Sequence, residues 1–587
     1  MYILGLYDGH DSGACIVKDG VVLRAVNEER LSRKKFHIGF PYLSIEFLLR
    51  DLKLRKKDIT HIAIGGLSGV VVKDVEDPTG GFGSGIGRVY SELSFLDFAL
   101  RQRFIRHIHI ASNLGLRKRN LLSTLKRLGF HQPVEFVEHH KSHAYSAYYT
   151  FGKHPAWVFT VDGTGDYISA TVYAPNNANA LSSPDNLDRN NPIHRIASTL
   201  TYDSPGYFYS EITHLLGFKM LRHEGKITGL AALGDPDKLY DQLKPALGLS
   251  KDKTEFRNRF KAVGMRAIRK MRKLTQNHEA KDIAAAAQYI LEETVVEHIA
   301  HMLRGEKKVD VALAGGTFAN VKLNQRVHEL SNINTLFIHP HMGDGGLNVG
   351  AALYVWSERA AKEGKAPKPK LMDHAYLGPE YNDKEIKAAI DRAGLKAHLN
   401  KNVEKEIAGY IADGKVVARF NGRMEYGPRA LGNRSILYSA KESSVNQWLN
   451  RRLKRTEFMP FAPSTLYEYK DHCYKNVAGA EHAAEFMTIT FDCTPWTKKN
   501  CPAIVHVDGT ARPQLVKKEI NPSYYKIIDE YRKITGSPTI VNTSFNMHEE
   551  PIVCTPDDAI RSYLQGHLDV IALGNWIITN PKAHKNE

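Results

Sequence analysis

The chain opens with Tyr2-Ile-Leu-Gly-Leu-Tyr-Asp-Gly-His-Asp-Ser-Gly-Ala-Cys-Ile-Val17, two apolar runs separated by a polar turn that contains glycine. A second turn leads to a third apolar run, Val21–Ala25. Short apolar runs that alternate with tight turns predict a meander of antiparallel strands. The same order of strand, acidic glycine turn and strand returns at Ala156–Tyr173. We therefore expect an internal duplication, in which each glycine-bearing turn lets backbone N–H groups approach a phosphate or a metal-bound ligand.

Two histidines four residues apart precede the second repeat. His139 and His143 belong to the run Val137–Tyr149, whose small and aromatic residues have helical spacing. Positions i and i+4 of a helix face the same side, so both imidazoles can bind one metal ion. Asp162, at a predicted strand end, and Asp344, at a predicted strand-to-helix turn, can each add a carboxylate oxygen. Such a set suits Fe(II), Mn(II) or Zn(II), although an HxxxH pair alone is more often structural.

A turn with paired glycines follows the predicted strand Val309–Ala314. Gly315 and Gly316 form this turn, and Asn320 precedes the next predicted helix. Because N–H groups at a helix N-terminus favour phosphate or ribose oxygens, the turn suits a nucleotide. By itself such a turn is weak evidence.

A charged, proline-bearing segment, residues 357–373, indicates a linker, and we place a domain boundary near residue 370. Beyond it, the predicted strand Val416–Phe420 leads into a glycine-rich loop that contains Arg423, Arg429 and Arg434. Three arginines on a shaped loop predict an anion cradle. More clusters of polar donors follow later predicted strands; each alone is best interpreted as an ordinary loop. Together, without an obvious Cys/His nucleophile, they indicate phosphate or adenylate chemistry.

Composition bounds the class of protein. A chain of 587 residues is too long for one core, so two or more domains are expected. Its five cysteines include no CxxC pair, which argues against a disulfide framework and a zinc-thiolate site. The first residues lack the pattern of a signal peptide, and no apolar run reaches membrane-spanning length. We therefore expect a cytoplasmic protein that does not associate with a membrane.

The net charge of +16 is concentrated in two segments, Arg101–Arg127 and Lys251–Lys273, which we expect to form amphipathic helices with one basic face. The simpler interpretation is a solvated face. The functional one is a field that attracts anionic substrates such as ATP. Nucleic-acid binding is the least favoured, because no aromatic–basic stacking motif accompanies the charge. Residues 174–200 are polar and rich in Asn, Asp and Pro, which predicts an irregular segment.

A series of short motifs runs in order along nearly the whole chain. They are Gly-His-Asp-Ser-Gly-Ala (9–14), Asn-Glu-Glu-Arg-Leu-Ser-Arg-Lys-Lys (27–35), His-His-Lys-Ser-His-Ala (139–144), His-Glu-Gly-Lys-Ile-Thr-Gly-Leu-Ala (223–231), Ala-Gly-Gly-Thr-Phe-Ala-Asn (314–320), Gly-Asp-Gly-Gly (343–346), Gly-Pro-Arg-Ala-Leu-Gly-Asn-Arg-Ser (427–435), Pro-Phe-Ala-Pro-Ser (460–464), Val-Asp-Gly-Thr-Ala-Arg (507–512) and Asn-Thr-Ser-Phe-Asn (542–546). In this order they resemble the NodU/CmcH/TobZ-type O-carbamoyltransferases.

The resemblance implies an α/β protein of two domains. Residues 1–370 would form a duplicated actin/hexokinase-like domain, similar to the Kae-type tRNA threonylcarbamoyltransferases, and residues 371–587 an α+β domain similar to YrdC. It implies that the carbamoyl group of carbamoyl phosphate moves, with ATP and its Mg, through carbamoyl-adenylate to a hydroxyl of a small molecule such as a sugar or natural product. The metal of the first domain would be Fe(II), with Mn or Zn as alternatives.

Site residues follow from the motif positions of the resemblance. The metal ligands would be His139, His143, Asp162 and Asp344. Asp8 and His10 would lie near the acceptor hydroxyl, with His10 the general base, and a histidine pKa near 6.5 suits that role. The nucleotide-binding turn would use Gly315, Gly316 and Asn320.

In the second domain, the residues implied to contact carbamoyl phosphate and ATP are Arg429, Lys454, Arg512 and Ser544. Met459 stands where many members have an arginine, and we expect Arg455 or Lys454 to supply that charge. The segments 66–130 and 174–220 are expected to shape the acceptor pocket.

Two alternatives to carbamoyl transfer onto a small molecule remain open at this point. One is a tRNA-modifying threonylcarbamoyl transferase, since both modules also serve that pathway and the chain is basic. The other is a non-catalytic nucleotide-binding protein. The fused order and the C-terminal motifs favour the small-molecule enzyme, without nucleic acid as a partner. Whether the chain forms a homodimer is left open.

Overall fold

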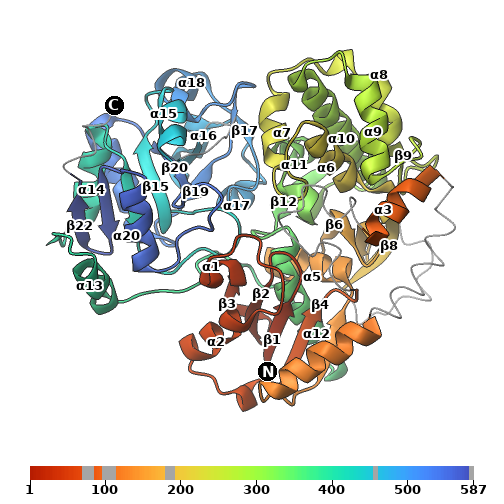
Figure 1. Ribbon diagram of the computed structural model, residues 1–587, viewed down its shortest axis with the longest axis horizontal. Helices are drawn as coiled ribbons and strands as arrows, with labels where there is room; N and C mark the ends of the chain where they lie inside the picture. The colour runs from red at the N-terminus through yellow and green to blue at the C-terminus, as the bar shows by residue number, and fades with distance from the viewer. Residues whose placement is uncertain (69–84, 96–113, 179–191, 454–460, 581–587) are drawn as a thin grey trace. The chain divides into compact units, whose positions relative to one another are not determined.

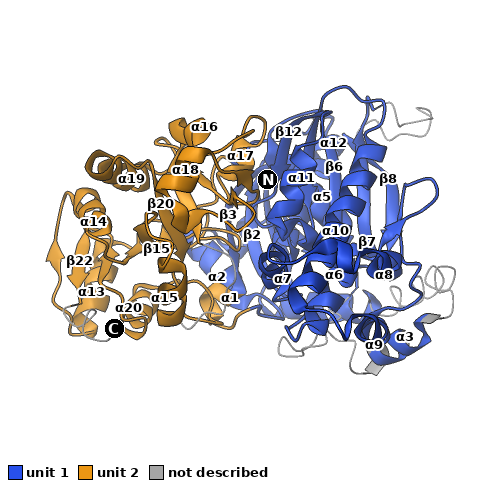
Figure 2. Cartoon of the chain, turned by 90° about the horizontal axis from the view of Figure 1, so that it is seen from above, with its two compact units in different colours: residues 1–28, 36–372 blue, residues 29–35, 373–587 orange. Residues whose placement is uncertain are grey.

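The computed structural model describes residues 1–68, 85–95, 114–178, 192–453 and 461–580. These residues form two compact units (Figure 2). Unit 1 consists of residues 1–28 and 36–372, and unit 2 of residues 29–35 and 373–587. The chain therefore passes between the units three times, after Glu28, after Lys35 and after Met372.

Unit 1 contains two five-stranded sheets with the same topology (Figure 1). The first has the order β3-β2-β1-β4-β5 and comprises β1 (Tyr2–Tyr7), β2 (Gly13–Lys18), β3 (Val21–Asn27), β4 (His61–Gly65) and β5 (Val134–Val137). The second has the order β8-β7-β6-β11-β12 and comprises β6 (Trp157–Gly165), β7 (Ile168–Pro175), β8 (Ile193–Leu200), β11 (Val309–Ala314) and β12 (Ile333–Ile338).

Each sheet begins with an antiparallel meander and continues with two strands parallel to its first strand. This repeat confirms the predicted internal duplication in an α/β unit. The burial of the strands explains their sequences. β1 and β7 are buried along almost their whole length. β1 is apolar throughout, and β7 is apolar apart from Ser169 and Thr171, as expected for strands covered on both faces.

The third strand of the second meander was missed by the prediction of an irregular segment at 174–200. β7 extends to Pro175, and β8 occupies Ile193–Leu200, paired antiparallel with β7. β8 lies at the sheet edge, and of its eight residues only Ile193 and Thr199 are buried. An edge strand with so few buried apolar positions carries a weak period-two signal. Residues 179–191 lie outside the described part.

One of the two basic segments, Lys251–Lys273, is less helical than expected. Residues 248–257 form a short hairpin of β9 (Gly248–Leu249) and β10 (Phe256–Arg257), and only α9 (Gly264–Thr275) is helical. Burial of Phe256 anchors this hairpin to the core. In the other segment, residues 114–127 are helical, and 101–113 lie outside the described residues.

Two helices form a layer between the sheets of unit 1. α5 (His139–Phe151) packs on the second sheet, α12 (Leu347–Lys362) packs on the first, and the helices contact each other. A Cβ on Gly350 would lie 1.7 Å from the carbonyl oxygen of Ser142, so this close approach requires glycine. Glu138 immediately precedes α5 and caps it, because its carboxylate accepts hydrogen bonds from the N–H groups of His140 and Lys141. The N-terminal end of α5 is thereby fixed.

Some of the remaining helices of unit 1 pack on the sheets, and others pack on neighbouring helices. They are α2 (Tyr42–Asp51), α3 (Gly85–Glu92), α6 (Pro205–Leu215), α7 (Glu224–Ala231), α8 (Tyr240–Leu243), α10 (Ala280–Met302) and α11 (Val321–His328).

Unit 2 is built on an eight-stranded mixed sheet. Its order is β13-β22-β21-β14-β15-β20-β16-β19, with β13 (His398–Leu399), β14 (Val417–Phe420), β15 (Arg434–Ser439), β16 (Ala462–Leu466), β19 (Gln514–Val516), β20 (Thr539–Ser544), β21 (Val570–Leu573) and β22 (Trp576–Thr579). Alternate residues enter different cores: Ala418 packs with one set of helices and Val417 with the other.

Helices cover both faces of this sheet. One core includes residues of α13 (Asp383–Arg392), α15 (Val445–Arg452) and α20 (Pro556–Gln565), and the other includes residues of α14 (Val403–Ala412) and α19 (Pro522–Thr535). Smaller elements complete the unit: α16 (Lys470–Cys473), α17 (Glu481–Ala484), α18 (Pro495–Asn500), β17 (Phe491–Asp492) and β18 (Thr510–Ala511).

Residues 29–35, most of the motif 27–35, belong to unit 2. α1 (Glu28–Ser32) begins at the last residue of unit 1 before the crossing. Leu31 packs against a cluster of Met424, Ala430, Ile552 and Cys554. Arg30 donates to the carbonyl oxygen of Gly427 at 3.0 Å, and Arg33 donates to that of Ile552 at 2.7 Å. A piece from the N-terminal part of the chain is thus built into unit 2.

Candidate metal centre

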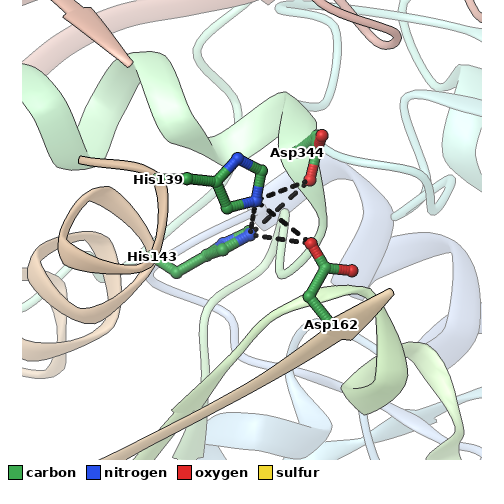
Figure 3. A group of neighbouring side chains, drawn as sticks. All are labelled: His139, His143, Asp162 and Asp344. Carbon is green, nitrogen blue, oxygen red and sulfur yellow. Dashed lines mark hydrogen bonds and ion pairs between the residues drawn. The ribbon is translucent and has the colours of Figure 1, made fainter. Parts of the chain in front are cut away.

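Four side chains from three separate elements meet inside unit 1 (Figure 3). α5 supplies His139 and His143, β6 supplies Asp162, and the turn before α12 supplies Asp344. One ligand atom from each lies within 4.8 Å of all the others. The four side chains are 0–13% exposed. The structure therefore brings together all four residues that the sequence indicated as metal ligands.

Asp162 divides its two oxygens between the cluster and the backbone. Oδ2 lies 3.1 Å from Nε2 of His139 and 3.4 Å from Nε2 of His143. Oδ1 accepts hydrogen bonds from the N–H groups of Gly163 at 2.8 Å and Gly316 at 3.2 Å. The backbone thus holds this carboxylate with a single oxygen facing the imidazoles.

Asp344 divides its oxygens in the same way, but side chains hold the second one. Oδ1 lies 3.4 Å from Nε2 of His139 and 3.6 Å from Nε2 of His143. Oδ2 accepts a hydrogen bond from the Tyr7 hydroxyl at 2.6 Å and lies 3.1 Å from Nε2 of His10. The predicted general base is therefore in contact with a predicted metal ligand.

The local backbone leaves room for the first imidazole and fixes its helix. A Cβ on Gly165 would lie 2.0 Å from the His139 ring. The carboxylate of Asp166 accepts the N–H of His139 at 2.8 Å, together with the N–H groups of Leu67 and Ser68. Since Asp166 is buried and has these donors from two segments, it ties the start of α5 to the loop after β4.

The electrostatics of the cluster favour a bound cation. Burial lowers the pKa of His139, but Asp344 and Asp162 outweigh burial and hold the pKa well above its usual value. Burial and Asp344 act to raise the pKa of Asp162, but hydrogen bonds from His139 and His143 outweigh both and lower it. Two buried carboxylates need compensating positive charge. With two neutral imidazoles, a divalent cation balances them, so the donor set fits a metal such as iron, manganese or zinc.

The loop that follows β1 carries the two residues expected near the acceptor. Burial lowers the pKa of His10, but the charge of Asp344 and then the contact with Asp11 outweigh it and raise the pKa to about 9. The Asp8 carboxylate forms an ion pair with Arg117. Both side chains are partly exposed, His10 to 29% and Asp8 to 18%, so a ligand can reach them.

Two residues of this site were not predicted from the sequence. Arg117 also donates to the backbone carbonyls of Gly65 and Gly66, and its side chain is only 9% exposed. It belongs to the basic run whose simplest interpretation was a solvated face, and only its partial burial in the fold identifies it. Tyr7 is buried, and burial followed by the charge of Asp344 raises its pKa well above the usual value, so it remains a hydrogen-bond donor. No local pattern distinguishes Tyr7 from an ordinary strand residue.

The predicted nucleotide-binding turn lies beside the metal cluster. The N–H of Gly316 donates to Asp162, and Gly315 has φ +105, with a Cβ position only 2.2 Å from the carbonyl oxygen of Val161. The Asn320 side chain accepts the N–H of Leu323 at the start of α11. Nucleotide binding by Gly315, Gly316 and Asn320 stays a prediction.

Three C-terminal motifs and Gln514, which lies two residues beyond a fourth motif, converge in unit 2 through one buried network. Ser464 donates to the side-chain oxygen of Gln514 at 2.7 Å, and Asn542 donates to both of them at 3.0 and 3.1 Å. Asn542 also donates to the carbonyl of Ala430, and Gln514 to that of Leu431. The strands β16, β19 and β20 are thereby joined to the glycine-rich loop at 427–435.

One arginine of that loop has a different role from the one expected. Arg434 is fully buried, stacks 3.7 Å from the Phe420 ring centroid, and donates to the carbonyl oxygens of Asn421, Gly422, Asn433 and Pro379. Its guanidinium therefore shapes the loop from inside and does not line an anion cradle, because backbone carbonyls accept from both of its terminal nitrogens.

Three of the expected phosphate contacts remain partly exposed in unit 2. Arg429, Arg512 and Ser544 are all half-buried. Ser544 pairs with Ser435 in the β15–β20 ladder, and its hydroxyl donates to Asn546 at 2.6 Å. Lys454, Arg455 and Met459 lie outside the described residues. The anion contacts of unit 2 stay predictions.

Comparison with known proteins covers most of the chain. Residues 2–353 match the family model "Carbamoyltransferase N-terminus", and residues 408–580 match "Carbamoyltransferase C-terminus". Nodulation protein NolNO of Sinorhizobium fredii is 31% identical over 97% of this chain and 79% of its own length. Nodulation protein NolO of Bradyrhizobium diazoefficiens is 32% identical over 75% of this chain and 78% of its own length.

A solved structure of full-length HypF, in a phosphate- and nucleotide-bound form, aligns with 61% of this chain and 55% of its own length, with a TM-score of 0.32 and 16% identity. That similarity is too weak to support an inference. Within the described part of the chain, no helix is both long and apolar enough to cross a membrane.

Proposed function

This chain belongs to the carbamoyltransferase family, and from that premise we propose that it is an ATP-dependent O-carbamoyltransferase acting on a hydroxyl of a small molecule. The carbamoyl group would come from carbamoyl phosphate through carbamoyl-adenylate. The observation that carries the proposal is the buried cluster of two histidines and two carboxylates in unit 1, with His10 and Asp8 on the loop beside it.

We assign adenylate formation to unit 2. Water would hydrolyse carbamoyl phosphate to carbamate and inorganic phosphate. The carbamate would then attack the α-phosphate of ATP and displace pyrophosphate, which gives carbamoyl-adenylate. Phosphoryl chemistry of this kind needs positioning and charge neutralisation more than a protein nucleophile. Arg429 and Arg512, on segments linked by the buried network, are suited to bind the phosphates. Mg would accompany ATP.

In unit 1 the acceptor hydroxyl would attack the carbamoyl carbon, and AMP would leave. A divalent metal held by the cluster of His139, His143, Asp162 and Asp344 would act as a Lewis acid toward a carbamoyl or phosphate oxygen. An alcohol is a poor nucleophile at neutral pH, so His10 would take the hydroxyl proton. For this His10 must be neutral, and a divalent cation bound beside Asp344 would offset the negative charge that raises the His10 pKa. Asp8, paired with Arg117, would accept a hydrogen bond from the acceptor and orient it.

Fe(II) is the metal that we propose first, with Mn and Zn as alternatives that the same donor set accepts. The acceptor is proposed to be a sugar or another natural product. We further propose a cytoplasmic setting, which is supported by five cysteines that are all free and buried.

The decisive test separates the two partial reactions. Purified protein is incubated with ATP, carbamoyl phosphate and Mg, and released pyrophosphate is measured without any acceptor and without tRNA. We expect release that depends on carbamoyl phosphate, and exchange of labelled pyrophosphate into ATP. A panel of sugars and hydroxylated natural products, followed by mass spectrometry, then detects carbamoylated products.

The control variant is Asp162→Asn, which should retain pyrophosphate exchange while losing carbamoyl transfer, since Asp162 lies in unit 1. Pyrophosphate release that requires tRNA, or none with both substrates present, would contradict the proposed function.

A further inference from the structure

The two predicted carboxylate ligands are held by different kinds of group. Backbone N–H groups of Gly163 and Gly316 hold the second oxygen of Asp162. Among the residues that the structure describes, side chains contact the second oxygen of Asp344: the Tyr7 hydroxyl at 2.6 Å and His10 Nε2 at 3.1 Å. His10 faces the acceptor side in the proposed reaction and has to be available there. The hydrogen bond that holds Asp344 throughout the reaction is therefore the one from the Tyr7 hydroxyl.

The chain is built to admit the Tyr7 hydroxyl at this place. Tyr7 is 7% exposed at the end of β1, and its hydroxyl reaches under the loop that follows. A Cβ on Gly9 would lie 2.1 Å from that hydroxyl oxygen and 2.2 Å from the ring carbon that bears it. Gly9 is not among the glycines with positive φ, so its backbone would accept other residues. The space taken by Tyr7 is what requires glycine there.

We infer that Tyr7 is a positioning residue, which fixes Asp344 as a one-oxygen metal ligand by holding its other oxygen. This role rests on the metal centre of the proposed function. A carboxylate held at one oxygen by a strong donor presents only the other to a metal, and such outer contacts are commonly worth 10–100-fold in metal affinity. The hydrogen bond also ties Asp344 to the residue that precedes Asp8, so the metal side and the acceptor side share one anchor.

The test uses Co²⁺ as the probe with the full-length, metal-free protein. Binding is followed by titration, and the visible absorption of bound Co²⁺ reports coordination number. We expect Tyr7→Phe to bind Co²⁺ about 10–100-fold more weakly than wild type. Its absorption should also weaken, because a released Asp344 can use both oxygens and raise the coordination number.

Gly9→Ala gives a second route that keeps the hydroxyl but displaces it, and we expect the same direction of change. Tyr2→Phe, on the same strand with its ring under Lys18, is the matched control and should leave affinity and spectrum unchanged. Thermal unfolding of the metal-free proteins shows whether each variant folds. If Tyr7→Phe does not fold, the Co²⁺ affinity of Gly9→Ala tests the role of Tyr7.

Two outcomes would contradict the role of Tyr7, and only one of them would also contradict the metal centre. Wild-type affinity and spectrum in both Tyr7→Phe and Gly9→Ala would remove the role of Tyr7 and leave the metal centre intact. A wild-type protein that does not bind Co²⁺ at all would remove the metal centre and the role of Tyr7 together.

Discussion

Two turns occupy equivalent places in the two repeats of unit 1 and have acquired different chemistry. In each, an aspartate follows the last regular ladder residue of the first strand of the meander. Asp8 follows Tyr7 at the end of β1, and Asp162 follows Val161 inside β6, where the pairing register shifts. Asp8 is paired with Arg117 and is open to solvent on one side. Asp162 faces two imidazoles and is held by backbone N–H groups. The duplication places an aspartate at a similar position in each repeat, and the groups that contact each aspartate determine its chemical role.

The sharpest way to break this comparison is to make the same substitution in both turns. In the second turn, we expect Asp162→Asn to release the metal, because a neutral amide cannot balance the cation. Since a metal contributes several kcal/mol of transition-state stabilisation, carbamoyl transfer should fall by roughly a thousandfold or more. Metal analysis of purified protein alongside the transfer assay measures both. Metal content equal to wild type would contradict the assignment of Asp162.

In the first turn, the matched substitution Asp8→Asn should leave metal content unchanged. We expect kcat/KM for the acceptor to fall about a hundredfold, since a positioned polar group that assists proton transfer typically contributes that much. The same two assays apply. Loss of metal in Asp8→Asn would show that the two turns share one task after all, and the comparison would fail.

A substitution of Arg117 tests the partner of Asp8 instead of Asp8 itself. Arg117→Lys keeps the charge near Asp8 but cannot contact two carbonyls and a carboxylate with one planar group. We expect an increase in acceptor KM of about tenfold, equivalent to ~1.4 kcal/mol, with metal content unchanged. Arg119→Lys, on the exposed side of the same helix, serves as control. A KM equal to that of wild type would exclude Arg117 from acceptor positioning.

Glu211 lies outside both turns, and its substitution is expected to affect activity least of the changes proposed. Burial raises the pKa of Glu211, on α6, to about 8 from 4.5. The folded state then keeps a proton that the unfolded chain releases, so stability is complete below pH 4.5 and is lost as pH rises through 8. The loss is on the order of 5 kcal/mol.

Glu211→Gln should therefore raise the melting temperature at pH 9 relative to wild type and change it little at pH 5. Thermal unfolding at the two pH values measures this, with the exposed Glu46→Gln as control. Parallel pH dependence in Glu211→Gln and wild type would show that Glu211 ionises normally.

Much of the fold and the metal cluster could be predicted because their signals are local. The spacing of His139 and His143 places them on one helix face, and the acidic turns reveal themselves by composition. β8 was missed because an edge strand buries few apolar residues. Arg434 was assigned to an anion cradle because a glycine-rich loop with arginines looks the same whether the guanidinium faces outward or supports the loop from within.

Contacts between distant segments could not be predicted in this way. Arg117 is separated by more than a hundred residues from Asp8, and Tyr7 by more than three hundred from Asp344. Nothing near either residue in the sequence marks its partner, since the pairing depends on how the sheets and helices pack. The sequence therefore indicated the ligands, and the structure was needed for the residues that hold them.

The three passages of the chain between the units have a consequence for how the protein can be divided. A fragment made of residues 373–587 alone would lack Leu31, Arg30 and Arg33, and would expose the apolar cluster that Leu31 covers. Cutting the chain at Met372 therefore does not separate the two units, because unit 2 also contains residues 29–35. Two polypeptides cut there would behave as a split protein, each incomplete until residues 29–35 of the first found their place in the second.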